Sequence, residues 1–320
     1  MEIHRRVFQI TNTIRIYGIT QQPVTHKYMM VLDFVRVGNL RDYLKNNFND
    51  INWKNKLYYL IELACDFKKI HELNIVHQDL HPGNILFDEF EEENEIRVSN
   101  FGFSSLIGKN SKNPEKKKKK RIFGVLPYIA PEVLSGEEYT KAADVYSFAF
   151  IAYEIFTGLL PYPDVPHDVV LARKICDGLR PKFPLHTPKL LKRIIMKCWD
   201  AQFTNRPTFK EVFDELWRYY CDHEVFKNNN EITIQIKKAE DFCKNKANRG
   251  FKLSTNLTIP SSLNHQTHPH AIYTSRFLNF SIHSKPKNES NFEKELEELT
   301  KSTSLSIIAS TPIETCISDS

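Results

Sequence analysis

Hydrophobic and polar positions divide the chain into a short β-rich start, a long helical middle and a polar end. Residues 13–19 and 27–35 are rich in β-branched and aromatic side chains, and the second run is apolar enough to predict a buried strand. Apolar side chains then recur at helical spacing over residues 53–71. A few strands followed by many helices predict an α+β chain, with a small β-rich lobe joined to a larger helical lobe.

Signals for helix ends are frequent after residue 140. Thr140 is expected to cap the start of a helix, and Gly158 suits the left-handed position after its last turn. Thr187 and Pro188 predict the start of another helix. Thr208 begins a Thr-x-x-Glu capping box for a last helix that ends near residue 220.

The composition changes after residue 221, where Ser, Thr, Asn, Lys and Pro become frequent. We expect some helix within residues 222–245, and a largely disordered segment over residues 246–320 with a short helix near 292–300. The predicted folded domain therefore covers residues 1–221, and residues 222–320 form a polar tail.

Charge and cysteine usage narrow the classes of function. The net charge is +5 over 320 residues, which does not indicate nucleic-acid binding. The longest apolar stretch, residues 148–160, contains Glu154 and is too short to span a membrane. Six cysteines without a C-x-x-C pair indicate reduced thiols. We therefore expect a soluble, cytoplasmic protein.

The clearest motif is V-H-Q-D-L-H-P-G-N-I-L at residues 76–86, which resembles the catalytic loop H-R-D-L-x-x-x-N of protein kinases. The resemblance implies that Asp79 accepts the proton of an attacking hydroxyl. It also implies that Asn84, five residues later, reaches a magnesium ion on the nucleotide phosphates. By the same resemblance, His77 packs structurally and Leu86 forms the floor of an adenine pocket.

Further kinase-like motifs follow in the order that the family has them: S-N-F-G at 99–102, A-P-E at 130–132, D-V-Y-S-F at 144–148 and N-R-P at 205–207. The first takes the place of D-F-G, so the resemblance makes Asn100 a metal ligand and Phe101 a structural residue. Asp144 would bind backbone amides of the catalytic loop. Arg206 would form a buried ion pair with Glu132, so both would be structural.

Upstream, M-V-L-D-F-V at residues 30–35 is similar to the fifth strand and hinge of a kinase. Leu32 would be the gatekeeper, and the backbone of Asp33, Phe34 and Val35 would bond adenine. The resemblance covers about residues 1–220 and is nearest to the tyrosine-kinase-like (TKL) branch. It implies a bilobal fold, with a partial small lobe at 1–35 and a large lobe at 36–221, and ATP and Mg²⁺ as cofactors.

The chain departs from the family at its start. No G-x-G-x-x-G occurs among its ten glycines. The first strands, the phosphate-covering loop and the strand-three lysine would all precede Met1, so the resemblance implies an N-terminally truncated domain. A fragment or an incomplete gene model would give the same sequence.

Other departures lie in the site itself. Asn100 replaces an aspartate and cannot neutralise charge on a metal ion. Gln78 replaces the arginine that pairs with a phosphorylated activation loop. Neither His81 nor Gly83 supplies the usual basic residue, and Val125 replaces the usual threonine, so the acceptor residue type stays open.

Three functions remain in competition. The family implies an ATP-dependent protein phosphotransferase in intracellular signalling, with a protein substrate or signalling partner. The missing glycine loop and lysine, together with Asn100, favour a pseudokinase scaffold for the chain as written. A small-molecule kinase also uses H-x-D-x-H-P-x-N but lacks the later motifs. A zinc site at His77 and His81 has no third ligand at suitable spacing. The Lys116–Lys120 run indicates a solvated insertion or a site for acidic partners.

Overall fold

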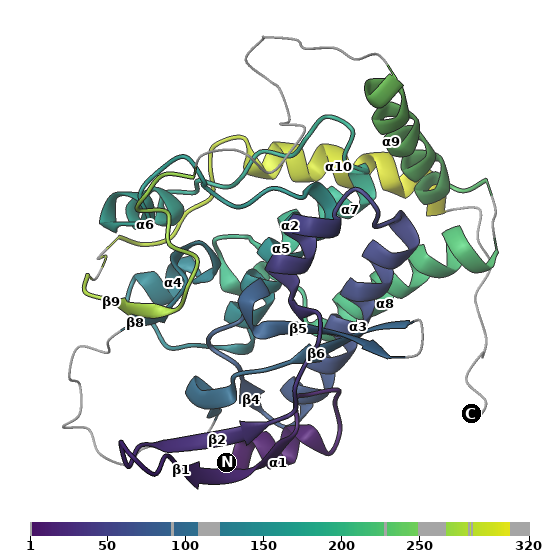
Figure 1. Ribbon diagram of the computed structural model, residues 1–320. Helices are drawn as coiled ribbons and strands as arrows, with labels where there is room; N and C mark the ends of the chain where they lie inside the picture. The colour runs from purple at the N-terminus through teal and green to yellow at the C-terminus, as the bar shows by residue number, and fades with distance from the viewer. Residues whose placement is uncertain are drawn as a thin grey trace.

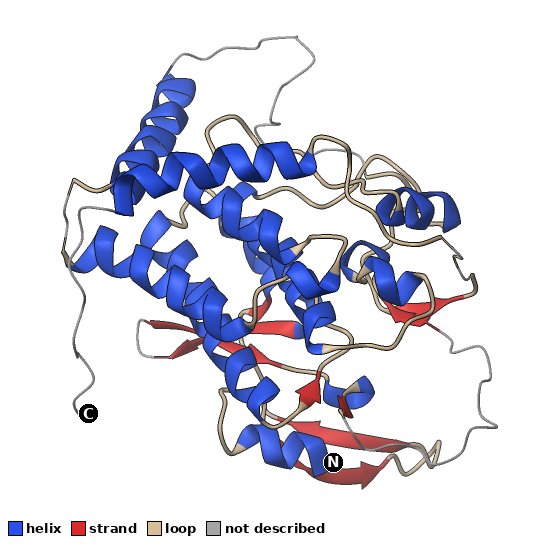
Figure 2. Ribbon diagram, turned by 180° about the vertical axis from the view of Figure 1, so that it is seen from behind, coloured by secondary structure: helices blue, strands red, loops and turns tan. Residues whose placement is uncertain are grey.

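The β-rich start of the chain forms a small lobe beside a larger helical lobe, as the resemblance implies (Figure 1). A computed structural model describes residues 2–90, 93–107, 122–226, 229–248, 267–280, 282 and 284–307. Seen from behind, the strands gather in the lower half of the molecule and most of the helices lie above them (Figure 2). The lysine run at 116–120 lies outside the described residues.

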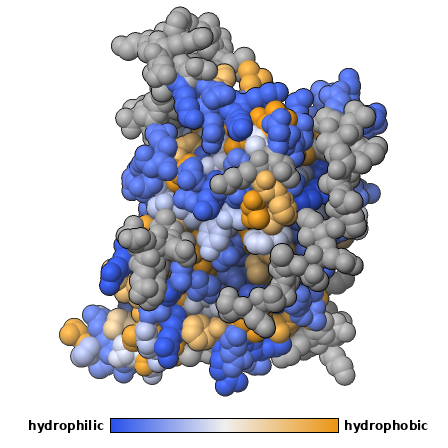
Figure 3. Space-filling view, turned by 90° about the vertical axis from the view of Figure 1, so that its right-hand side faces the viewer, coloured by the Kyte–Doolittle hydropathy of each residue, from blue (hydrophilic) through white to orange (hydrophobic). Residues whose placement is uncertain are grey.

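In the small lobe, helix α1 (Glu2–Phe8) lies beside the antiparallel strands β1 (Ile16–Gln21) and β2 (Tyr28–Leu32). The two strands were predicted, but the prediction that the second is buried is wrong. Every residue of β2 is exposed, with Tyr28 at 78% and Met30 at 61%. Apolar composition does not show whether another part of the chain covers a strand. Among the described strands, β2 pairs only with β1. Figure 3 shows orange surface at this lower end of the molecule.

The small lobe is joined to a three-stranded sheet of order β3-β5-β6, built from β3 (Gly38–Asn39), β5 (Ile85–Phe90) and β6 (Glu93–Val98). Thr13 forms a parallel bridge with Val98 at the end of β6. The Asp33 carboxylate accepts a bond from Arg97 Nη1 at 3.3 Å. The antiparallel strands β5 and β6 therefore connect the two lobes.

The large lobe is built around helix α5 (Lys141–Thr157), whose residues from Ala143 to its end are all buried. Helix α3 (Trp53–Glu72) agrees with the predicted helix at 53–71 and packs against α8 (Phe209–Tyr220). The capping box at Thr208 is present, and Gly158 ends α5 with a φ of 70°. Thr140 is the N-cap residue of α5, and its carbonyl accepts from the Ala143 amide, but its side chain makes no capping bond, contrary to expectation.

The remaining elements complete the large lobe. The helices are α2 (Leu40–Asn47), α4 (Pro131–Leu134), α6 (Val169–Cys176), α7 (Lys189–Cys198), α9 (Glu231–Asn248), α10 (Phe292–Ile307) and the π-helix at Cys221–Val225. The short strands pair as β4 (Ile75–Val76) with β7 (Ser105–Leu106) and as β8 (Ile122–Gly124) with β9 (Arg276–Leu278). Pro188 precedes α7 without a side-chain capping bond. Within the described ranges, none of the helices has the length and apolar content needed to cross a membrane.

The polar tail differs from the expectation of a largely disordered segment wherever the structure describes it. Strand β9 pairs with β8, and α10 packs against α7, with Phe292 and Leu299 buried (Figure 1). The backbone of Glu289 passes so close to Gly178 that a Cβ at that glycine would collide with it. The described parts of the tail are attached to the large lobe by a few buried side chains and by backbone hydrogen bonds.

A buried ion pair connects two segments that lie far apart in the sequence. Arg206 Nη1 and Nη2 donate to Glu132 Oε1 and Oε2 at 2.8 and 2.7 Å, and both side chains are almost fully buried. Arg206 also donates from Nε to the Asp200 carbonyl at 2.8 Å and from Nη1 to the Ala142 carbonyl at 2.9 Å. The pair expected from the A-P-E and N-R-P motifs is therefore present.

We predict that Arg206→Ala lowers the free energy of unfolding by about 3–5 kcal/mol, because it leaves the Glu132 carboxylate buried and unpaired. Urea denaturation followed by circular dichroism measures this loss. The control Lys210→Ala breaks an exposed pair with Asp214 and should leave the free energy of unfolding almost unchanged. Equal stability of the Arg206 variant and wild type would contradict the burial of this pair.

Candidate active site

A single buried carboxylate positions the loop that carries the sequence motif. Asp144 lies in the first turn of α5 and accepts from the backbone amides of His77 and Gln78, at 2.9 and 3.1 Å. The His71 ring lies 3.0 Å from the same carboxylate. Gln78 has a φ of 72°, a left-handed conformation that is uncommon for such a residue. The hydrogen bonds that the two amides donate to the Asp144 carboxylate hold it there.

The His77 ring joins the loop to the N-F-G segment. Its Nδ1 accepts from the Asp79 amide at 3.3 Å, so its Nε2 carries the proton and donates to the Ser99 carbonyl at 2.9 Å. The ring packs edge-on against Phe101, with centroids 5.0 Å apart, and Phe101 contacts His4 of α1 at 5.8 Å. These contacts connect α1, the N-F-G segment and the loop.

Asp79 and Asn84 are adjacent and buried, as the motif spacing predicts. Asn84 Nδ2 donates to the Asp79 carbonyl at 2.7 Å and to Asp79 Oδ2 at 3.2 Å. Burial raises the pKa of Asp79, and hydrogen bonds to its carboxylate oppose that shift. The amide oxygen of Asn84 is left to face Asn100, whose Nδ2 lies 3.4 Å from it.

Asn100 has a left-handed backbone, with a φ of 63°, which asparagine tolerates better than most residues. Its side chain and that of Asn84 offer oxygen atoms, the donor type that Mg²⁺ prefers, but neither carries charge. A magnesium ion held here would replace the bond from Asn100 Nδ2 to the Asn84 oxygen, and its negative ligands would have to come from nucleotide phosphates. No cluster of three or more His, Cys, Asp or Glu side chains suited to a metal ion occurs in the part of the chain that the structure describes.

The residues expected to bind adenine lie near one another but are open to solvent. Leu32 ends β2 and is 40% exposed, and Phe34 is 84% exposed. Leu86 on β5 is partly buried and is the cross-strand partner of Arg97, which binds Asp33. Arg97 therefore places the hinge-like segment beside the strand that bears Leu86.

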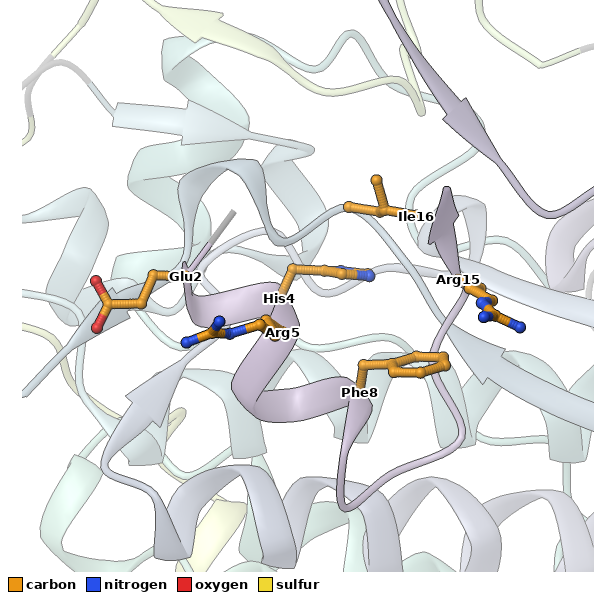
Figure 4. Close-up of a pocket in the computed structure, with 6 residues that line it drawn as sticks. All are labelled: Glu2, His4, Arg5, Phe8, Arg15 and Ile16. Carbon is orange, nitrogen blue, oxygen red and sulfur yellow. The ribbon is translucent and has the colours of Figure 1, made fainter. Parts of the chain in front are cut away.

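A pocket of about 430 Å³ lies elsewhere, between α1 and the start of β1. It is lined by Glu2, His4, Arg5, Phe8, Arg15 and Ile16 (Figure 4). The Glu2 side chain points away from the His4 ring in this view, and Glu2 is exposed. None of the residues predicted to act in catalysis or nucleotide binding lines this pocket.

Two residues at the site were missed by sequence reasoning. Ser275 of the tail donates to Asp79 Oδ1 and Oδ2, at 2.9 and 2.8 Å, although 196 positions separate the two residues. His81 Nε2 lies 2.9 Å from the same hydroxyl oxygen. The serine stands in a polar segment without any motif, so no sequence signal could have found it. His81 was considered only as a departure from the lysine usual at its position and as part of a zinc site that lacked a third ligand.

A buried cluster of polar side chains connects α2 to α5. Arg41 Nη2 donates to the Tyr128 hydroxyl at 3.1 Å, and that hydroxyl donates to Glu154. Burial raises the pKa of Glu154 to about 7, and the Arg41 guanidinium and the bond from Tyr128 limit the rise. Glu154 is therefore a carboxyl whose charged form is disfavoured in the folded chain.

Comparisons with known proteins agree with the motifs. A model of the family described as protein tyrosine and serine/threonine kinase matches residues 2–216. A protein of Acanthamoeba polyphaga mimivirus, provisionally named a serine/threonine-protein kinase/receptor, is 35% identical over 200 residues, which are 61% of this chain and 12% of that protein. Stress-activated protein kinase alpha of Dictyostelium discoideum is 31% identical over 234 residues, 68% of this chain and 35% of the relative.

A third relative, the RGS domain-containing serine/threonine-protein kinase A of Dictyostelium discoideum, is 29% identical over 206 residues. They are 64% of this chain and 17% of that kinase. The aligned parts thus amount to 12–35% of the length of these three relatives. The similarity is confined to one region of larger proteins.

We predict that Glu154→Gln stabilises the fold in a pH-dependent way. The folded pKa, about 7, lies above the ordinary value of 4.5, so the wild type loses stability as pH rises between these values. The variant should match the wild type near pH 4.5 and exceed it by on the order of 2–3 kcal/mol at pH 8. Denaturant melts across this pH range measure the difference. The control Glu137→Gln, at an exposed site, should follow the wild-type curve.

Proposed function

This chain belongs to the protein tyrosine and serine/threonine kinase family, and from that premise we propose that it is the catalytic region of an ATP-dependent protein phosphotransferase in intracellular signalling. The observation that carries the proposal is the buried Asp79 carboxylate, held beside Asn84 and in contact with a hydroxyl group. That is the arrangement needed to orient an attacking hydroxyl and take its proton. The motifs further favour the TKL branch.

In this proposal each residue has a limited task. Asp79 accepts the hydroxyl proton, and Asn84 fixes the orientation of Asp79 through two hydrogen bonds. Asn84 and Asn100 would hold Mg²⁺ through their amide oxygens, and the ion when bound supplies charge neutralisation on the phosphates. Leu32, Leu86 and the backbone of residues 33–35 would receive adenine. His77, Phe101, Asp144 and the Glu132–Arg206 pair hold these groups in place.

Serine or threonine is the acceptor that we favour. The relatives reported above include proteins named as serine/threonine kinases, and the hydroxyl at Asp79 belongs to a serine. We also place the protein in the cytoplasm, because the cysteines that the structure describes are free thiols. A protein substrate suits the A-P-E and N-R-P motifs better than a small molecule does.

A second candidate function is a pseudokinase that binds a partner without transferring phosphate. The observation that favours it is the neutral pair of amides, Asn84 and Asn100, where the family has a carboxylate. The neutral pair weakens the hold on a metal ion, and it does not affect the surface of the large lobe.

We predict that ATP binds to residues 1–320 weakly and with little help from Mg²⁺. At a concentration 100 times its dissociation constant, a ligand stabilises the folded state by about 2.7 kcal/mol, which a thermal shift detects. Asn100→Asp should increase the part of the shift that depends on Mg²⁺, because it adds a charged ligand. Asn49→Asp, which makes the same substitution at an exposed site in the large lobe, is the control. The absence of any shift with ATP would contradict nucleotide binding.

We further predict that phosphate transfer by residues 1–320 is very slow or absent. Losing one preorganised electrostatic group costs about 10²–10³-fold in rate, and this chain departs from the family at several such groups. Asn100→Asp alone should restore little. Transfer of labelled phosphate to a generic protein substrate measures the rate. Robust transfer that Asp79→Asn abolishes would show instead an ordinary enzyme with an unusual metal site.

A further inference from the structure

A strand of the tail lies in the active site and continues along the segment before A-P-E. Strand β9 pairs antiparallel with β8, so that Arg276 faces Gly124 and Leu278 faces Ile122. Ser275 comes directly before this strand and lies against Asp79. The pairing therefore positions the Ser275 hydroxyl through backbone contacts that do not depend on side-chain identity.

The hydrogen bonds around Ser275 have a definite direction. His81 Nδ1 accepts from the Gly83 amide at 3.0 Å, so Nε2 carries the ring proton and donates to Ser275 Oγ at 2.9 Å. Burial lowers the pKa of His81 to about 3, so the ring is neutral. The serine then donates its own hydrogen to Asp79. The hydroxyl is thus oriented with its proton toward the candidate base.

Residues on both sides of Ser275 are held by the large lobe. Before it, Arg41 Nη1 donates to the Tyr273 carbonyl at 2.7 Å, and the Tyr273 hydroxyl donates to the Pro161 carbonyl at 2.9 Å. After it, Arg276 Nη2 donates to the His167 carbonyl at 2.6 Å, and Leu278 is 4% exposed. The lobe therefore provides an aromatic subsite two positions before the serine and an apolar subsite three positions after it.

We infer that this surface is the acceptor-strand site of the proposed phosphotransferase, and that residues 272–278 occupy it as a tethered competitor of protein substrates. The inference rests on the proposed function. The ligand class that the site fits is an extended serine-containing segment, with an aromatic residue two positions before the serine and an aliphatic residue three positions after it. Covering the surface of the lobe does not require a hydroxyl within 2.8 Å of Asp79 Oδ2, so this contact favours occupancy of the acceptor position.

A labelled peptide of residues 270–280 tests the occupancy without any need for catalysis. In the full chain, the tethered copy has an effective concentration of roughly millimolar and competes with the added peptide. Ser275→Asp places a carboxylate beside Asp79, so the tail should leave and the peptide should bind at least about tenfold more tightly than to wild type. Thr274→Asp, the same charge on the exposed neighbouring residue, should leave peptide affinity unchanged.

Leu278→Asp is a second variant, because it disrupts the apolar subsite contact without touching Asp79, and it should also raise peptide affinity. Hydrogen exchange at residues 122–124 checks both variants, since release of β9 exposes the amides of β8. Equal peptide affinity for wild type, Ser275→Asp and Leu278→Asp would overturn the inference. So would equal effects of the charges at 274 and 275.

Phosphate incorporation separates this inference from the proposed function. Mass spectrometry after incubation with ATP and Mg²⁺ should find phosphate on Ser275 if any residue of the tail is modified. Phosphate on an added substrate but none on Ser275 would overturn the inference. Phosphate nowhere agrees with the slow transfer predicted above. Together with peptide binding that the two variants enhance, it would favour the pseudokinase alternative and would still support the acceptor-strand site.

Discussion

The active-site loop depends on one buried carboxylate. Asp144 accepts hydrogen bonds from two backbone amides of the loop and contacts His71. It lies in α5, which is buried along nearly its whole length. A buried charge is stable only when such bonds compensate for its lost hydration, so the carboxylate and the loop stabilise each other. Through this contact the rigid centre of the large lobe determines where Asp79 and Asn84 lie.

A buried ion pair extends the same arrangement toward the segment on which the tail strand lies. Arg206 binds Glu132 and the Ala142 carbonyl, which lies two residues before Asp144. The helix that bears Glu132 follows the segment containing β8, and β8 is the edge on which the tail strand lies. Catalytic loop, A-P-E segment and strand-binding edge are therefore parts of one hydrogen-bonded framework around the start of α5. The small lobe lies outside it, which accounts for its exposed strands.

The tail adds a hydrogen-bonded side chain to the candidate active site. His81, Ser275 and Asp79 form a chain of hydrogen bonds, and Arg41 joins the tail to the buried Tyr128–Glu154 pair. The residue that replaces the family's lysine is thus a neutral donor to the hydroxyl. Such a donor can orient an acceptor but cannot neutralise phosphate, which agrees with a site adapted more to holding a strand than to fast transfer.

The sequence by itself determined the parts of this protein that have local signals or fixed motif spacing. The capping box at Thr208, the left-handed Gly158, and the pairing of Asp79 with Asn84 follow from contacts between residues close in sequence. The kinase-like motifs also predicted the distant Glu132–Arg206 pair, because motifs in this order imply a fold in which the two residues meet. Tertiary structure alone decided that β2 is exposed and that Ser275 reaches Asp79. Burial and docking depend on which surfaces meet across the fold. Neither the apolar content of a strand nor a single serine in a polar tail shows which distant residues it will contact.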